Sequence, residues 1–176
     1  MTLQLSSVVV PSVAAGLTVL DSILAKARAF STERKVEPAA LLEARLVPDM
    51  FTFANQIQLA TDTARRAIER LAEQEVSSKP DPEPTFDALE ARIRETLEAV
   101  RKADVARIDA SVDRAFEVAY TPELKVPYTG KTYAMSFLIP NFYFHVVTGY
   151  NILRERGVVL GKMDFLAPVS AEYKVM

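Results

Sequence analysis

Apolar residues recur three and four positions apart in four stretches of the chain, which is the spacing of helices that bury one face. The longest regular run begins at Met50 and continues to Leu71. This pattern predicts long helices joined by polar connections. The expected helices run from Ser6 or Pro11 to Phe30, from Pro38 onward with an interruption at Pro48 and a new cap at Asp49, from the cap Thr85 to about Lys102, and from Ala134 to Arg156 with a kink at Pro140 and a stop at Gly157.

Two segments between these helices have a different pattern. Ser77–Pro84 contains three prolines in five residues, which predicts an extended surface connection. Phe116–Tyr120 and Lys131–Tyr133 flank a turn region at Pro127 and Gly130, and this arrangement fits either a short β-hairpin or an ordered loop. We therefore expect an all-α fold, an antiparallel four-helix bundle of the single domain 1–176, with that hairpin or loop before the last helix.

Composition narrows the class of protein. The chain has 176 residues, of which 49% are hydrophobic and 25% charged, as in one soluble globular domain. A net charge of -2 argues against nucleic-acid or membrane partners, which require excess Lys and Arg. The uncharged N-terminal stretch lacks a preceding Lys or Arg and is interrupted by Pro11, Ser12 and Thr18, so we expect neither a signal peptide nor a membrane span. The absence of cysteine favours the cytoplasm.

Few residues offer reactive chemistry. Without cysteine there is no thiol nucleophile or thiolate metal site, and the single histidine limits any metal site to carboxylates around one imidazole. The segment from Gly157 to Lys162 resembles a phosphate-binding loop only superficially, because its spacer is short and Met163 stands where Ser or Thr is needed. We interpret it as a helix cap followed by a turn.

His145 is the residue of most interest because it lies in the most aromatic stretch of the chain, Pro140–His145. Polar residues within an aromatic segment are typical of ligand pockets. Three interpretations remain open: an imidazole satisfied by hydrogen bonds at the bundle edge, a ligand-binding residue, and a metal ligand or catalytic base. The candidate pocket residues are His145, Asn141, Tyr143 and Gln56.

Two blocks of sequence resemble a family of bacterial and fungal proteins of unknown function, DUF1993. The first runs from Leu138 to His145 and continues through Tyr150–Val158 and Gly161–Leu166; the second runs from Leu42 to Gln58. The blocks occur in the family's order at suitable distances, and the Phe86–Leu97 helix falls where its third helix is expected.

That family is similar to the DinB-like, or YfiT-like, superfamily of four-helix bundles, which are commonly homodimers. Many members hold a metal on three histidines, one from the second helix and two at His-x-x-x-His spacing in the fourth, and some are thiol-dependent transferases or isomerases. Here His145 matches the first of the fourth-helix pair, but Gly149 stands four residues later. The second helix offers only the amides of Asn55 and Gln56, which are poor ligands. Because these positions depart from the superfamily's pattern, we expect no metal and no cofactor.

Two functional hypotheses follow. The first is a homodimeric binding or interaction module without metal, whose pocket around His145 holds a small molecule. The second is a DinB-like enzyme of the transferase or hydrolase type, in which His145 acts as a base or binds metal with carboxylates such as Asp49 or Asp62. We favour the first. The dimer is expected to form partly through the first and last helices. Phe142 and Phe144 lie on opposite sides of the last helix and give it more apolar surface than one bundle core covers.

Overall fold

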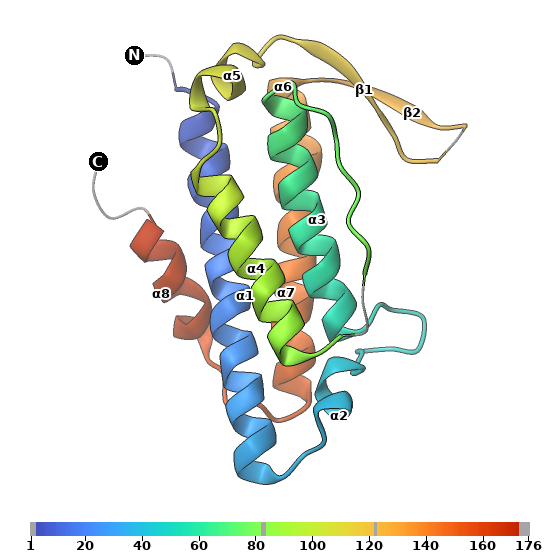
Figure 1. Ribbon diagram of the computed structural model, residues 1–176, viewed down its shortest axis with the longest axis vertical. Coiled ribbons are helices and arrows are strands. Elements are labelled where there is room, and N and C mark those ends of the chain that lie inside the picture. The colour runs from blue at the N-terminus through green and yellow to red at the C-terminus, as the bar shows by residue number, and fades with distance from the viewer. Residues whose placement is uncertain (1–2, 82–83, 122, 173–176) are drawn as a thin grey trace.

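The computed structural model describes residues 3–81, 84–121 and 123–172, and it is mostly helical with one two-stranded sheet (Figure 1). The helices are α1 (Ser6–Arg34), α2 (Pro38–Leu42), α3 (Phe53–Leu71), α4 (Phe86–Arg101), α5 (Val105–Ala110), α6 (Gly130–Tyr133), the π-helical turn η1 (Ala134–Leu138), α7 (Ile139–Glu155) and α8 (Lys162–Glu172); the strands are β1 (Ala115–Ala119) and β2 (Lys125–Thr129).

Four long helices, α1, α3, α4 and α7, lie side by side (Figure 1). Helix α3 packs on α7 and α4, and α1 packs on α4 and α7. The directions differ from the expected arrangement, since α3 and α4 run the same way. The connection between these two helices passes back along the length of the molecule before α4 begins (Figure 1). Its prolines suit it to this extended path.

The core is tightly packed where α1 crosses α7. Phe142 has no exposed surface, and its ring lies where a Cβ on Gly16 would come within 2.3 Å of it. Helix α1 therefore needs glycine at this crossing. On the other side of α1, α8 packs along the helix, an element that the sequence pattern did not predict (Figure 1).

Helix α1 continues through Pro11, so the earlier of its two expected starts, near Ser6, is confirmed. It starts at Ser6, whose backbone nitrogen and hydroxyl donate to the Asp109 carboxylate of α5 at 2.8 and 3.0 Å. Pro11 lies in the second turn, so the helix forgoes the one intrahelical bond that an N–H at this position would donate to the Ser7 carbonyl. By length and composition α1 is apolar enough to cross a membrane, but 56% of its most apolar window is buried within the protein.

The caps of the central helices follow ordinary rules. The α4 cap at Thr85 is confirmed, since its hydroxyl oxygen accepts from the Ala88 backbone N–H at 3.1 Å. The expected cap at Asp49 is wrong. Residues 43–52 are not helical, and α3 begins after Thr52, whose hydroxyl oxygen accepts from the Asn55 N–H at 3.2 Å. Threonine and aspartate both cap helices through a side-chain oxygen. The apolar periodicity therefore could not decide whether α3 starts after Asp49 or after Thr52.

The segment before α7 forms a hairpin, the first of the two alternatives that the sequence allowed. Strands β1 and β2 pair antiparallel, with Val118 opposite Val126. The expected second strand at Lys131–Tyr133 is instead helix α6, and Pro127 lies inside β2. An edge strand tolerates proline because one of its sides needs no ladder bonds. The hairpin extends away from the helices (Figure 1).

The stretch expected as one helix from Ala134 to Arg156 consists of η1 followed by α7, which begins at Ile139. Pro140 follows the π-helical turn, where the wider spacing accommodates a residue that cannot donate an N–H. The helix ends at Glu155. Gly157 has a φ of 85° and Val158 donates its N–H to the Leu153 carbonyl at 3.0 Å, as expected for a glycine stop.

Candidate functional site

The His145 side chain lies at the seam between α7 and α3, where it is held by Gln56. His145 Nδ1 lies 2.8 Å from Gln56 Oε1, and both side chains are buried, with exposed fractions of 8% and 1%. The Gln56 amide nitrogen donates to the Phe51 carbonyl oxygen at 3.3 Å. This second bond orients the amide, so its oxygen accepts and His145 Nδ1–H donates.

The orientation of Gln56 determines which nitrogen of His145 is available. With the proton on Nδ1, Nε2 carries the lone pair. Nε2 makes no hydrogen bond within the described residues, and no fully buried nitrogen or oxygen of a described side chain lacks a partner, so this atom is accessible to solvent. Burial lowers the pKa of His145 below its ordinary value. The site thus presents a neutral, fixed hydrogen-bond acceptor.

Gly149 faces the same point on α3. A Cβ on Gly149 would lie 3.8 Å from the Gln56 Cβ and 3.6 Å from the Phe53 ring, at ordinary contact distances. Positions 56, 145 and 149 therefore converge, as the resemblance to three-histidine proteins implied for these positions. One of the three has no side chain, and the Gln56 oxygen already holds His145 Nδ1. These residues do not fit a three-histidine metal site.

The other two candidate pocket residues lie elsewhere. The Asn141 amide donates to the Thr63 hydroxyl at 3.1 Å, one turn away from His145 along the same seam. Tyr143 is on the opposite side of α7, where its hydroxyl donates to the Ser12 carbonyl of α1 at 2.9 Å. Helical residues two positions apart face different directions, which separates Tyr143 from His145. The structure therefore brings together only His145 and Gln56 among the four.

The carboxylates considered as partners of His145 are also remote from it. Asp49 is exposed on the segment before α3. Asp62 faces α4 and is already paired, because Arg65 and Arg92 lie 3.1 and 2.8 Å from its carboxylate. Across the described ranges, no group of three or more His, Asp or Glu side chains is placed to hold a metal ion.

Exposed apolar side chains lie beside the His145–Gln56 pair. Phe144 is 57% exposed and its ring centre lies 5.5 Å from that of His145. Phe51, whose carbonyl oxygen accepts from the Gln56 amide, is 60% exposed. We call this surface, formed by Phe51 and Phe144 beside His145, the His145 face. Such exposed apolar groups are typical of binding surfaces.

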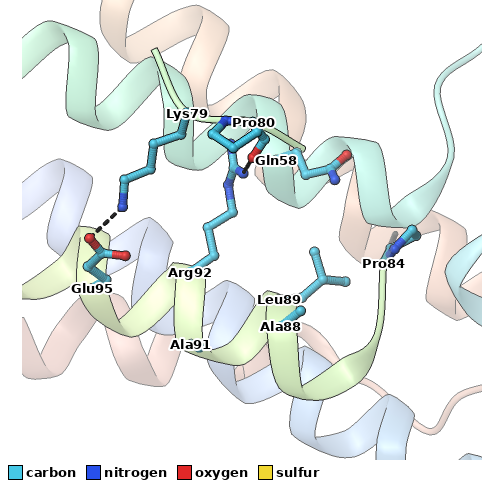
Figure 2. Close-up of a pocket in the computed structure, with 9 residues that line it drawn as sticks. All are labelled: Gln58, Lys79, Pro80, Pro84, Ala88, Leu89, Ala91, Arg92 and Glu95. Atoms are coloured by element: carbon cyan, nitrogen blue, oxygen red, sulfur yellow. Dashed lines mark hydrogen bonds and ion pairs between the residues drawn. The ribbon is translucent and has the colours of Figure 1, made fainter. Parts of the chain in front are cut away.

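Sequence reasoning missed a separate cavity, which lies between α3 and α4 and has a volume of about 340 Å³ (Figure 2). Gln58 and Arg92 are among the residues that line it. The available signal was the glutamine itself, a polar residue at a position where the helical period places it toward a neighbouring helix.

Comparisons with known proteins agree with the fold. The model of the DUF1993 family, a domain of unknown function, matches residues 5–166. The chain is similar to a solved structure, a DinB family member protein from Shewanella denitrificans, with 35% sequence identity and a TM-score of 0.79. The similarity covers 89% of this chain and 88% of that one. No curated protein matches the sequence.

Proposed function

This chain belongs to the DUF1993 family, and from its DinB-like fold and the His145 geometry we propose that it is a binding module that works without a metal ion. In this proposal the four long helices form a DinB-like bundle that carries the His145 face. His145 Nε2 accepts a hydrogen bond from the bound molecule, and the apolar side chains around it supply contact area. The cysteine-free chain suits the cytoplasm.

One observation carries this proposal: the bond between Gln56 and His145 Nδ1. It uses the glutamine oxygen to orient a neutral imidazole toward open space, where it accepts a hydrogen bond. A metal-binding histidine also needs an oriented ring, but it needs further ligands beside it. Gly149 supplies none.

The experiment restores the missing ligands. Gln56→His combined with Gly149→His places three imidazoles at the converging positions, and zinc binding is measured by titration calorimetry. We expect no stoichiometric zinc site in the unmodified protein and one site per chain in the double variant. Adding His145→Ala to the double variant serves as the control and should abolish binding. A stoichiometric site in the unmodified protein that His145→Ala removes would contradict the proposal.

A second candidate function is favoured by the same neutral imidazole, because an oriented acceptor nitrogen is what a general base requires. In a thiol transfer, Nε2 would take the thiol proton, the sulfur–carbon bond would form and the leaving group would depart. The test measures reaction of glutathione with chlorodinitrobenzene, which releases chloride. The binding module predicts no rate above buffer. A rate that requires His145 and is lost in His145→Ala would favour the enzyme.

We further propose that the chain forms a twofold dimer in which a second copy packs on Phe144, at the edge of the His145 face, and leaves His145 Nε2 to the bound molecule. Helix α8 packs along one side of α1, so in this proposal α7 contributes most of the interface. Phe144 and Phe51 are 57% and 60% exposed, which is a large apolar load for an uncovered surface. Because a twofold interface pairs one patch with itself, Phe144 would meet the same region of the partner.

A further inference from the structure

The cavity between α3 and α4, which we call the α3–α4 pocket, has the features of a small-molecule site separate from the His145 face. Its volume of about 340 Å³ falls in the range of ligand pockets. Its walls are mainly apolar. Pro80 and Pro84 of the connection lie on one side, and Ala88 and Leu89 of α4 lie on the other (Figure 2).

The charged groups around the pocket are already paired. Lys79 forms an ion pair with Glu95 at one end of the pocket (Figure 2). The Arg92 guanidinium forms two ion pairs, with Nη2 2.8 Å from the Asp62 carboxylate and Nη1 2.8 Å from the Asp81 carboxylate. Its Nε donates to the Thr61 hydroxyl at 2.8 Å. Neither of the two cations that line the pocket is thus left to attract a carboxylate, and the Glu95 carboxylate would repel one.

One donor remains, on Gln58. The Thr52 hydroxyl accepts from the Asn55 backbone N–H, so it donates its own proton to Asn55 Oδ1, at 2.8 Å. The Asn55 amide nitrogen then donates to Gln58 Oε1, also at 2.8 Å. Each bond fixes the direction of the next. The chain of bonds ends with the Gln58 amide nitrogen as a donor.

The Gln58 amide nitrogen is available to a ligand. Gln58 lines the pocket and is 5% exposed. Its nitrogen has no hydrogen-bond partner among the described residues, yet no described buried nitrogen lacks one, so the atom borders open space. In Figure 2 the side chain extends from α3 above Leu89. A ligand acceptor at this point would take the place of the water that the donor otherwise binds.

We propose that the α3–α4 pocket binds a small, uncharged apolar molecule whose carbonyl oxygen accepts a hydrogen bond from the Gln58 amide nitrogen. The apolar walls fit the body of such a molecule. The fixed donor selects an oxygen acceptor, and the paired charges around the pocket select a neutral one. This site is independent of the His145 face, because Gln58 and Gln56 lie on different sides of α3.

The test uses two probes of nearly the same shape, acetophenone with a carbonyl and ethylbenzene without one. Each is titrated into uniformly ¹⁵N-labelled full-length protein, and the side-chain amide signals are followed by NMR. We expect acetophenone to shift the Gln58 amide signal and the backbone signals of Ala88 and Leu89. It should bind roughly fivefold to tenfold more tightly than ethylbenzene, the difference for one hydrogen bond. Benzoate, the charged counterpart, should bind more weakly than acetophenone.

A variant tests the donor itself. Gln58→Leu keeps the volume and removes the amide, and it should make the two probes bind equally; Gln74→Leu is the control, since Gln74 lies outside the pocket. The comparison of probes on the unmodified protein does not depend on the variant's folding. Equal binding of both probes to the unmodified protein, or shifts confined to other regions, would overturn the proposal.

Discussion

At the scale of single residues, the sequence identified His145 because it is the only histidine and lies among aromatic residues. It also identified Gln56 and Gly149 as replacements for metal ligands. The structure adds the bond that links His145 to Gln56, which no sequence pattern specifies because it joins α7 to α3. Tyr143 could have been separated from His145 by helical geometry alone, since two residues turn a helix by about 200°. The role of Gln58 required knowledge of the hydrogen-bond chain behind it.

The first prediction concerns the protonation of His145. Burial lowers its pKa in the folded protein, whereas the unfolded chain takes a proton near the ordinary value of 6.5. As pH falls below that value, the unfolded state binds more protons, and stability falls until the folded pKa is reached. We expect the free energy of unfolding to fall more steeply between about pH 7 and pH 5 than it does in His145→Gln, which retains a polar partner for Gln56.

An NMR titration of the imidazole checks the same prediction directly, because His145 is the only histidine in the chain. We expect a pKa below the ordinary value and the neutral proton on Nδ1. A pKa at or above the ordinary value, or a proton on Nε2, would show that Gln56 does not orient the ring as described.

At the scale of elements, the long apolar runs identified α1, α3, α4 and α7, since their periodic faces are buried against one another. The short elements were harder to foresee. Helices α5 and α6 have too few residues to establish a period, and α8 has no strong apolar face of its own. The cap of α3 is Thr52 instead of the expected Asp49, because the chain before Thr52 packs without helical structure.

The element-scale prediction tests the crossing of α1 and α7. Gly16→Ala places a methyl group 2.3 Å from a ring carbon of Phe142, which is fully buried and cannot move aside easily. We expect a loss of about 1–3 kcal/mol in the free energy of unfolding, as for other overpacked cores. Gly161→Ala is the matched control, since a Cβ there has no atom within 4 Å. Equal free energies of unfolding for the two variants in chemical denaturation would refute the close contact between Gly16 and Phe142.

At the scale of the whole molecule, the order of helices could be predicted but not their directions. The Ser77–Pro84 connection was expected to be extended, yet its sequence does not say whether it turns back at once or passes along the bundle. The structure shows the longer path, which makes α3 and α4 parallel (Figure 1). This path creates the wall of the α3–α4 pocket, so the pocket could not be foreseen from any one element.

The whole-molecule prediction is the dimer. Light scattering at micromolar concentration should give twice the 19.5 kDa mass of the chain. Phe144→Asp places a charge in the proposed interface and should give the mass of one chain, because an unpaired buried charge is unfavourable. Val159→Asp is the control, since Val159 is exposed beyond the end of α7 and should leave the dimer intact. A mass of one chain for the unmodified protein would contradict the proposed dimer.

The central claim is that the His145 face binds without a metal ion, and native mass spectrometry tests it most directly. The protein is prepared without a histidine tag and without added metal or chelator, and one spectrum then reports subunit number, metal and any retained small molecule. We predict a dimer without stoichiometric metal. A spectrum with one transition metal per chain, lost in His145→Ala, would contradict the account.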